Sequence, residues 1–433
     1  MHTLEQLRSG ALAGIRRLDL SADLTELPPD VFDLADTLEV LNLSGNRLSR
    51  LPPDLGRLHR LKIVFCSDNA FTHLPEVLGD CAALQVVGFK ANRIAHVPPS
   101  ALSPALRWLV LTDNAIAQLP AALGERPALQ KLMLAGNQLS NLPPSLAGAQ
   151  RLELVRLAAN RLSDVPGWLT ELPRLAWLAL AGNPLGWSLP PLSPLATVPW
   201  GQLQLGALLG EGASGHIYRV ERQHGATAEA LALKLFKGAV TSDGLPEHER
   251  AACLAAGQHP ALCTPSAELC DHPQGASGLL LPLIPPSRSN LAGPPSLDSC
   301  TRDVYPSGWR LDAHAAVHLA QTVAQAVAHL HRCGVLHGDL YAHNVLCNPA
   351  NGDALLSDFG AATRLPADQP ALSRALQALE VRALGCLLEE LAAHALAGPG
   401  VDALARLGQL CQHPQPGQRP TVAEVCDDLQ ALL

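Results

Sequence analysis

The chain has 433 residues, which is more than one compact core usually holds, so we expect two domains. Its formal net charge of −8 provides no basic stripe for a nucleic-acid partner. Hydrophobic residues make up 48% of the chain, but no uninterrupted apolar run of about 18 residues predicts a membrane span. The composition therefore favours a globular protein that binds neither nucleic acid nor membrane.

The first residues and the cysteines indicate the compartment. Residues 1–8 lack the basic start and apolar run of a secretory signal. The 11 cysteines are odd in number and none forms a C-x-x-C pair, which argues against a disulfide framework and against a zinc site. We therefore expect reduced thiols and a cytoplasmic location.

The N-terminal half contains a regular repeat that is marked by asparagines. They are Asn46, Asn69, Asn92, Asn114, Asn137, Asn160 and Asn183, spaced 22 or 23 residues apart. Each follows an L-x-x-L-x-L type frame, which predicts a short strand with one buried face. This pattern resembles the leucine-rich repeat over residues 15–186, and the degenerate segment before it resembles an N-terminal cap. We expect a leucine-rich-repeat domain over residues 1–186.

In such repeats, the strand residues between the buried leucines face the concave side of the solenoid. A solvated strand face would favour Thr, Ser, Asn and charged residues, but the side chains expected there include Phe65, Trp108, Met133, Arg156 and Trp177. These residue types are enriched at the energetic centres of protein interfaces. We therefore predict that this face binds a protein substrate or regulator; packing against the second domain is the alternative.

The repeat ends in a proline-rich segment over residues 187–198, which suits a stiff linker. Residues 199–433 then form the second expected domain. It begins with a G-x-G-x-x-G run over Gly210–Gly215, where backbone amides can approach phosphate oxygens without an intervening side chain. A strand-like run with Lys234 at its centre follows, and a charge in a buried strand needs a partner.

Two further motifs follow in the second domain. Residues 337–344 read H-G-D-L-Y-A-H-N, and residues 358–360 read D-F-G. In order and approximate spacing, these motifs resemble those of eukaryotic-like protein kinases of bacterial type. The resemblance implies a multidomain α+β protein, with an N-terminal leucine-rich-repeat solenoid followed by a two-lobed protein-kinase-like domain. The small lobe would span about 199–283 and the large lobe about 284–433.

The resemblance also implies roles for individual residues and the cofactors ATP and Mg²⁺. Lys234 would hold the α- and β-phosphates and pair with Glu249, or failing that with Glu247. Asp339 would orient the acceptor hydroxyl and take its proton. The predicted metal ligands are Asn344 and Asp358, and the predicted ATP-binding residues are Gly210, Gly212, Gly215, Ile217, Ala232, Lys234, Leu281, Pro282 and Ile284.

The hinge between the lobes is expected at Leu281–Ile284, with Leu281 at the gatekeeper position. Pro282 lacks an N–H but keeps the carbonyl that the adenine amino group needs, and the amide donor would come from Ile284. By resemblance, residues 337–344 are the catalytic loop, and an amphipathic helix is expected upstream of it from about Asp312. Downstream, residues 381–386 resemble the start of the central helix of the large lobe.

Several residues depart from the family pattern. Gly338 replaces the arginine that pairs with a phosphorylated activation segment in many kinases, and only 22 positions separate Asp358 from Glu380. Regulation by such phosphorylation is therefore not expected. Tyr341 replaces the lysine typical of serine/threonine kinases, and His343 is the only cationic candidate nearby. A Pro/Ser-rich stretch over residues 285–309 reads as a loop insertion or a substrate-positioning element.

We therefore predict an ATP-dependent protein kinase that phosphorylates serine or threonine rather than tyrosine, with repeats that recruit its substrate or a regulator. A nucleotide-binding pseudokinase scaffold and a small-molecule kinase are the alternatives. The first is favoured by the absence of the catalytic-loop lysine, the second by His-Gly-Asp and the short activation segment.

Overall fold

The computed structural model describes residues 1–192, 194–212, 214–224, 227–237, 240–241 and 243–433. The chain forms two compact units. The first contains Met1–Leu172 and Asn183–Leu185, and the second contains Pro173–Gly182 and Gly186–Leu433. The strand of the last predicted repeat therefore belongs to the second unit. Among the described helices, none is long and apolar enough to cross a membrane.

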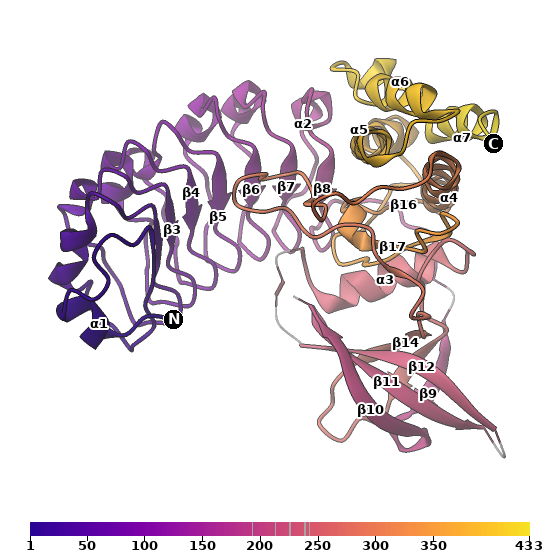
Figure 1. Ribbon diagram of the computed structural model, residues 1–433, viewed down its shortest axis with the longest axis horizontal. Coiled ribbons are helices and arrows are strands. Elements are labelled where there is room, and N and C mark those ends of the chain that lie inside the picture. The colour runs from indigo at the N-terminus through magenta and orange to yellow at the C-terminus, as the bar shows by residue number, and fades with distance from the viewer. Residues whose placement is uncertain (193, 213, 225–226, 238–239, 242) are drawn as a thin grey trace. The chain divides into compact units, whose positions relative to one another are not determined.

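The first unit is a leucine-rich-repeat solenoid, as predicted. Its parallel strands are β1 (Arg17–Asp19), β2 (Val40–Asn42), β3 (Ile63–Phe65), β4 (Val86–Gly88), β5 (Trp108–Val110), β6 (Lys131–Met133) and β7 (Leu154–Arg156). Its helices are α1 (Leu4–Arg8) and α2 (Gly167–Glu171), with short 3-10 helices η1 (Pro29–Leu34), η2 (Leu55–Arg57), η3 (Glu76–Asp80), η4 (Pro99–Ala101), η5 (Ala121–Glu125) and η6 (Pro144–Gly148). In Figure 1, β3 to β7 run side by side in chain order.

The repeating asparagines hold successive coils together. The Asn137 side-chain amide donates to Leu111 O at 2.9 Å and to Leu134 O at 3.0 Å, and its Oδ1 accepts from the Ile116 N–H at 3.0 Å. The middle residue of each strand is buried, as with Leu132 at 1% exposure. Each coil thus satisfies backbone groups of the coil before it, and this requirement fixes the asparagine period.

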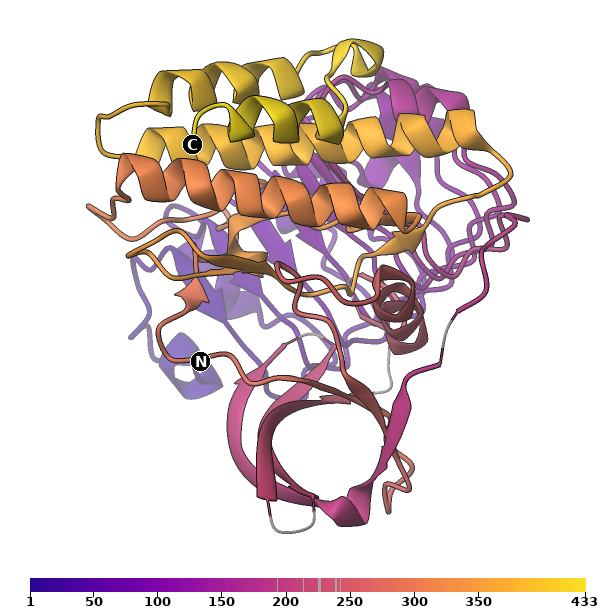
Figure 2. The same cartoon turned by 90° about the vertical axis from the view of Figure 1, so that its right-hand side faces the viewer.

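The second unit begins with strand β8 (Trp177–Ala179) and continues with a sheet lobe. The lobe contains β9 (Ala196–Pro199), η7 (Trp200–Gln202), β10 (Leu203–Glu211), β11 (Gly215–His224), β12 (Thr227–Phe236), α3 (Pro246–Ala256), β13 (Ala267–Cys270) and β14 (Gly278–Pro282). The six strands pair in the order β10-β11-β12-β14-β13-β9. Figure 2 shows this sheet curled into a nearly closed ring. Its core includes Val220, Leu233 and Leu280.

The helical lobe follows and carries the loops of the candidate site. Its elements are β15 (Ser289–Asn290), α4 (Ala313–Arg332), β16 (Val335–Leu336), η8 (Ala342–Asn344), β17 (Val345–Cys347), β18 (Ala354–Leu356), β19 (Thr363–Arg364), α5 (Pro370–His394), α6 (Val401–Cys411), η9 (Pro416–Gln418) and α7 (Val422–Gln430). The orange helix α4 and the golden helix α5 lie side by side in Figure 2. The predicted multidomain α+β architecture, a repeat solenoid followed by a two-lobed domain, is therefore confirmed.

The starts of two helices in this lobe can be compared with those that the sequence predicts. The Asp312 side chain caps α4 by accepting the His314 N–H at 2.9 Å, which confirms the predicted start. The predicted start of the central helix near residue 381 is wrong, because α5 already begins at Pro370. Proline at the first helical position needs no N–H partner, so it can open the helix well before residues 381–386.

Candidate active site

A cleft of about 500 Å³ lies in the second unit between the sheet lobe and the helical lobe. Nearly all predicted nucleotide, metal and catalytic residues line it: Gly210, Gly212, Gly215, Ile217, Ala232, Lys234, Glu249, Leu281, Pro282, Ile284, Asn344 and Asp358. Residues far apart in the sequence thus converge on one site. Pockets of this size and mixed lining hold ligands of nucleotide dimensions.

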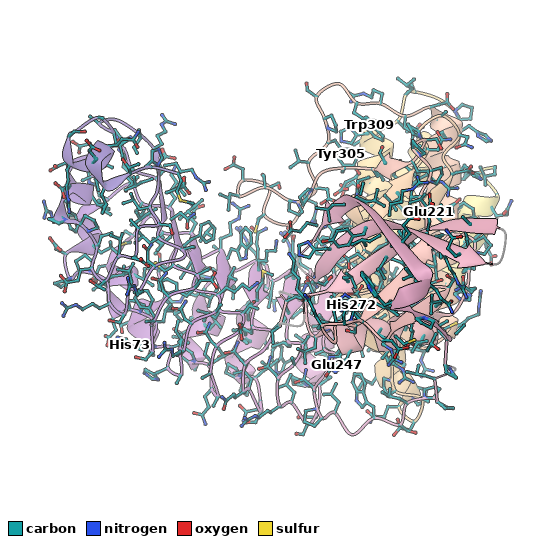
Figure 3. The ribbon with its side chains drawn as sticks, turned by 90° about the horizontal axis from the view of Figure 1, so that it is seen from below. His73, Glu221, Glu247, His272, Tyr305 and Trp309 are labelled. Atoms are coloured by element: carbon teal, nitrogen blue, oxygen red, sulfur yellow. The ribbon has the colours of Figure 1, made fainter. Side chains whose placement is uncertain are left out.

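Lys234 and Glu249 form a buried ion pair at this cleft. Lys234 Nζ contacts Glu249 Oε1, and it lies 4.0 Å from Asp358 Oδ1. Burial alone would lower the pKa of Lys234, but the neighbouring carboxylates of Glu249 and Asp358 outweigh this effect and raise it. The lysine is therefore a fixed cation. Glu247, labelled in Figure 3, is exposed and does not make this contact.

The glycine-rich loop connects β10 and β11 over the cleft. A Cβ at Gly215 would lie 2.3 Å from Leu235 O, so packing between strands requires glycine there. A Cβ at Gly210 or Gly212 would have no neighbour within 4 Å, so the backbone at these two positions is open to a ligand. Lys237 ties the loop down through Glu211 Oε1 at 2.6 Å and Gly212 O at 3.1 Å. Ala213 lies outside the described residues.

The predicted hinge residues lie at the end of β14. Ala232 pairs with Leu281 across the sheet, so these two side chains lie at neighbouring positions on the cleft wall. Pro282 ends the strand and pairs with Leu231. Ile284 follows and also lines the cleft.

The catalytic-loop residues are joined by short hydrogen bonds. Asn344 Nδ2 donates to Asp339 Oδ2 at 2.8 Å and to Asp339 O at 2.9 Å. Asn344 O accepts from the Ser357 N–H at 2.9 Å, which links this loop to the strand preceding Asp358. Asp339 itself does not line the cleft and meets it through Asn344. Asp358 has a φ of +63° and is half exposed.

These groups suit a magnesium–nucleotide complex. Asn344 uses its amide nitrogen to bind Asp339, which leaves its amide oxygen for a cation. The Asp358 carboxylate is exposed to the cleft, and Oδ1 accepts the Gly360 N–H at 3.1 Å. Magnesium is commonly bound by one or two such oxygens together with substrate phosphates, rather than by an all-protein cage. Among the described residues, no cluster of three or more His, Cys, Asp or Glu ligands occurs.

The proline-rich insertion, residues 285–309, supports the catalytic loop. The sequence pattern does not predict this contact. Asp303 accepts the His343 main-chain N–H at 2.9 Å and contacts His343 Nδ1 at 2.8 Å. Asn290 donates its side-chain amide to His343 O. Burial alone would lower the pKa of His343. The hydrogen bond and charge of Asp303, together with the charges of Asp339 and Asp358, outweigh this effect and raise the pKa.

The same insertion is anchored to helix α5. Tyr305 donates to Glu390 Oε2 at 3.1 Å and stacks on His394 at a ring distance of 4.1 Å. Tyr305 and Trp309 lie close together in Figure 3, with ring centroids 5.4 Å apart. No spacing signal marks Asn290 or Asp303, because their partners lie about 40 to 53 positions away in the chain.

The predicted partner-binding residues do not share one environment. Phe65, Trp108 and Met133 are partly exposed on β3, β5 and β6. Arg156 and Trp177 are buried, at 2% and 1% exposure. Trp177 belongs to the second unit, where its ring stacks on Tyr341 at 4.2 Å.

Together, a sheet lobe, a helical lobe and a cleft with a buried lysine–glutamate pair define a two-lobed domain in a chain that also carries a repeat solenoid. Comparison with known families agrees. Residues 291–381 match the protein kinase domain, and residues 37–58 and 127–185 match the leucine-rich-repeat families. The chain therefore carries leucine-rich repeats at its N-terminus and a protein kinase domain at its C-terminus.

Among solved structures, the chain is similar to a leucine-rich-repeat protein of Leptospira interrogans. The two are 28% identical over 41% of this chain and 45% of that one, with a TM-score of 0.38. The match thus spans less than half of the length of either protein.

Proposed function

We propose that the second unit is an active protein kinase that transfers the γ-phosphoryl group of ATP to serine or threonine hydroxyls. One observation supports this most. Lys234 is paired with the buried Glu249, and its Nζ lies 4.0 Å from Asp358 Oδ1 in the cleft that Asn344 also lines. A pseudokinase scaffold would not need all of these groups together.

In the proposed reaction, the acceptor oxygen forms a bond to the γ-phosphorus while the bond to the bridging oxygen of ADP breaks. Asp339 takes the proton of the hydroxyl, and Asn344 fixes the orientation of that carboxylate through its 2.8 Å hydrogen bond. Lys234 holds the phosphates from the sheet lobe. Mg²⁺, held by Asn344 and Asp358 with the nucleotide, would offset the charge that develops on the phosphates.

The repeats, in this proposal, recruit the protein substrate or a regulator through the concave strand face of the first unit. Trp108 is partly exposed and lies beneath Lys131, whose Nζ is 4.2 Å from the ring centroid. Phe65 packs over Gly88, where a Cβ would lie 2.4 Å from its ring. These aromatic groups offer large, rigid contact surfaces. Trp177 is buried and is left out of the proposed surface.

Transfer of label from [γ-³²P]ATP tests the proposal in full-length protein. We expect label on serine or threonine of the protein itself or of lysate proteins, and none with Lys234→Met, because the phosphates lose their fixed cation. Trp108→Ala should lower labelling of recruited proteins but leave autophosphorylation intact.

Other outcomes identify the alternatives. A protein whose melting temperature rises with ATP but which transfers no label would be a nucleotide-binding scaffold. Label that appears only in the small-molecule fraction would indicate a small-molecule kinase. The short segment between Asp358 and α5 is the feature that favours this alternative.

A further inference from the structure

The strand of the last repeat lies against the catalytic loop, inside the second unit. The Trp177 ring is parallel to Tyr341, with centroids 4.2 Å apart and an interplanar angle of 7°. Trp177 Nε1–H donates to Leu340 O at 2.9 Å. Leu340 directly follows Asp339, so one buried tryptophan fixes both residues that follow the proposed base.

The same coil also contacts the segment that follows Asp358. The Leu180 N–H donates to Thr363 Oγ1 at 3.0 Å, and Thr363 pairs with Leu336 next to the catalytic loop. Gly338 has a φ of +73°, and a Cβ there would lie 2.6 Å from Leu178 O. An arginine, which many related kinases have at this position, would therefore collide with the repeat strand.

The N-terminal end of this coil is anchored to the helical lobe. Arg382, on α5, donates to Arg174 O at 3.0 Å, and Arg419 donates to Pro173 O at 3.0 Å. Beyond the coil, Ser188 O accepts the Ala367 N–H at 3.0 Å. Both arginines are mostly buried, so these bonds are shielded from water. The coil is held on both sides of Trp177.

We propose that the terminal repeat coil, Pro173–Gly182, is a permanent part of the catalytic site, and that Trp177 is a positioning residue for the catalytic loop. The coil supports the loop where the shortened segment between Asp358 and Pro370 provides little support of its own. The active arrangement is therefore built by the last repeat and does not depend on a phosphorylated activation segment. This inference rests on the proposed kinase function.

Full-length variants test the role of Trp177. Trp177→Ala removes the stack and the hydrogen bond, and we expect kcat to fall about 100-fold while the affinity for ATP stays unchanged, because only the loop carrying Asp339 loses its support. Trp177→Phe keeps a ring on Tyr341 but loses the N–H donor, so a smaller fall of about fivefold is expected. Trp168→Ala, on α2 of the first unit, is the matched deletion and should leave kcat unchanged.

Hydrogen exchange provides a readout that does not require turnover. Amides of residues 336–345 should exchange faster in Trp177→Ala and in Trp177→Phe than in the wild type, and at the wild-type rate in Trp168→Ala. If Trp177→Ala does not fold, kcat and hydrogen exchange are both measured on Trp177→Phe.

The outcomes separate this inference from the proposed function. Unchanged kcat and unchanged exchange in Trp177→Phe and Trp177→Ala would overturn it. Equal losses of ATP affinity and kcat, with exchange raised throughout the second unit, would show a merely structural tryptophan and would also overturn it. Wild-type protein that transfers no phosphate would refute the kinase function instead, and the exchange rates would still decide the positioning role.

Discussion

The substitution Gly338→Ala tests how closely the repeat strand approaches the catalytic loop. Its Cβ would lie 2.6 Å from Leu178 O and 2.7 Å from Ala361 O, both backbone atoms that cannot rotate away. Gly338 also has a φ of +73°, which costs a non-glycine residue about 1 kcal/mol. Overlap with two carbonyl oxygens adds about 2 kcal/mol, as other overpacked sites do. We expect a loss of about 3 kcal/mol in the free energy of unfolding.

Gly334→Ala is the matched control, because Gly334 has a φ of +68° but a Cβ there would have no neighbour within 4 Å. It should cost about 1 kcal/mol, the backbone contribution alone. Scanning calorimetry of the full chain can follow the unfolding of the second unit, which under the proposed function is the transition that added ATP shifts. Equal losses in the two variants would refute the close approach of Leu178 to the catalytic loop.

Other variants probe the repeat ladder and the insertion. Asn137→Ala leaves buried backbone groups without partners, so urea denaturation should show a loss of about 3 kcal/mol, while exposed Asn141→Ala should cost almost nothing; equal costs would contradict the ladder. Asp303→Asn weakens the two contacts of this side chain with the main-chain N–H and Nδ1 of His343, and we expect kcat to fall about tenfold with KM for ATP unchanged. An unchanged kcat would contradict this role. Burial, with the charge of Asp303, raises the pKa of Glu390 to about 7, so its protonated form is favoured in the folded state. That stabilisation is complete below about pH 4.5 and lost as the pH rises through 7, so Glu390→Gln should be about 3 kcal/mol more stable than the wild type at pH 8 and nearly equal at pH 4.5; a constant difference across this range, measured by urea denaturation, would contradict it.

The sequence predicted those parts of the molecule whose chemistry is local. The asparagine period marks a solenoid because each Asn side chain must satisfy backbone groups of the neighbouring coil, as Asn137 does. Likewise, the glycine loop, Lys234 and the H-G-D and D-F-G motifs each occupy a few adjacent positions. Their convergence on one cleft follows from the two-lobed fold.

The contacts that hold the catalytic loop were not predictable, because they join distant segments. Asp303 lies in a proline-rich stretch without periodicity, and its partner His343 is 40 positions away. Trp177 and Leu340 are 163 positions apart. The repeat spacing cannot distinguish Trp177 from Trp108, because each is the first residue of its strand. Only packing distinguishes the buried tryptophan from the partly exposed one. The sequence does not predict the early start of α5, because no apolar motif marks Pro370.

The central claim is that Asp339 drives phosphoryl transfer in a cleft that binds ATP through other residues. Single-turnover transfer from [γ-³²P]ATP, with ATP affinity measured in parallel, tests it most directly on the wild type and Asp339→Asn. We expect the variant to bind ATP and Mg²⁺ as tightly as the wild type but to transfer at least about 100-fold more slowly, because it lacks the proton acceptor. Equal transfer rates, or wild-type protein that binds ATP without transfer, would contradict the claim.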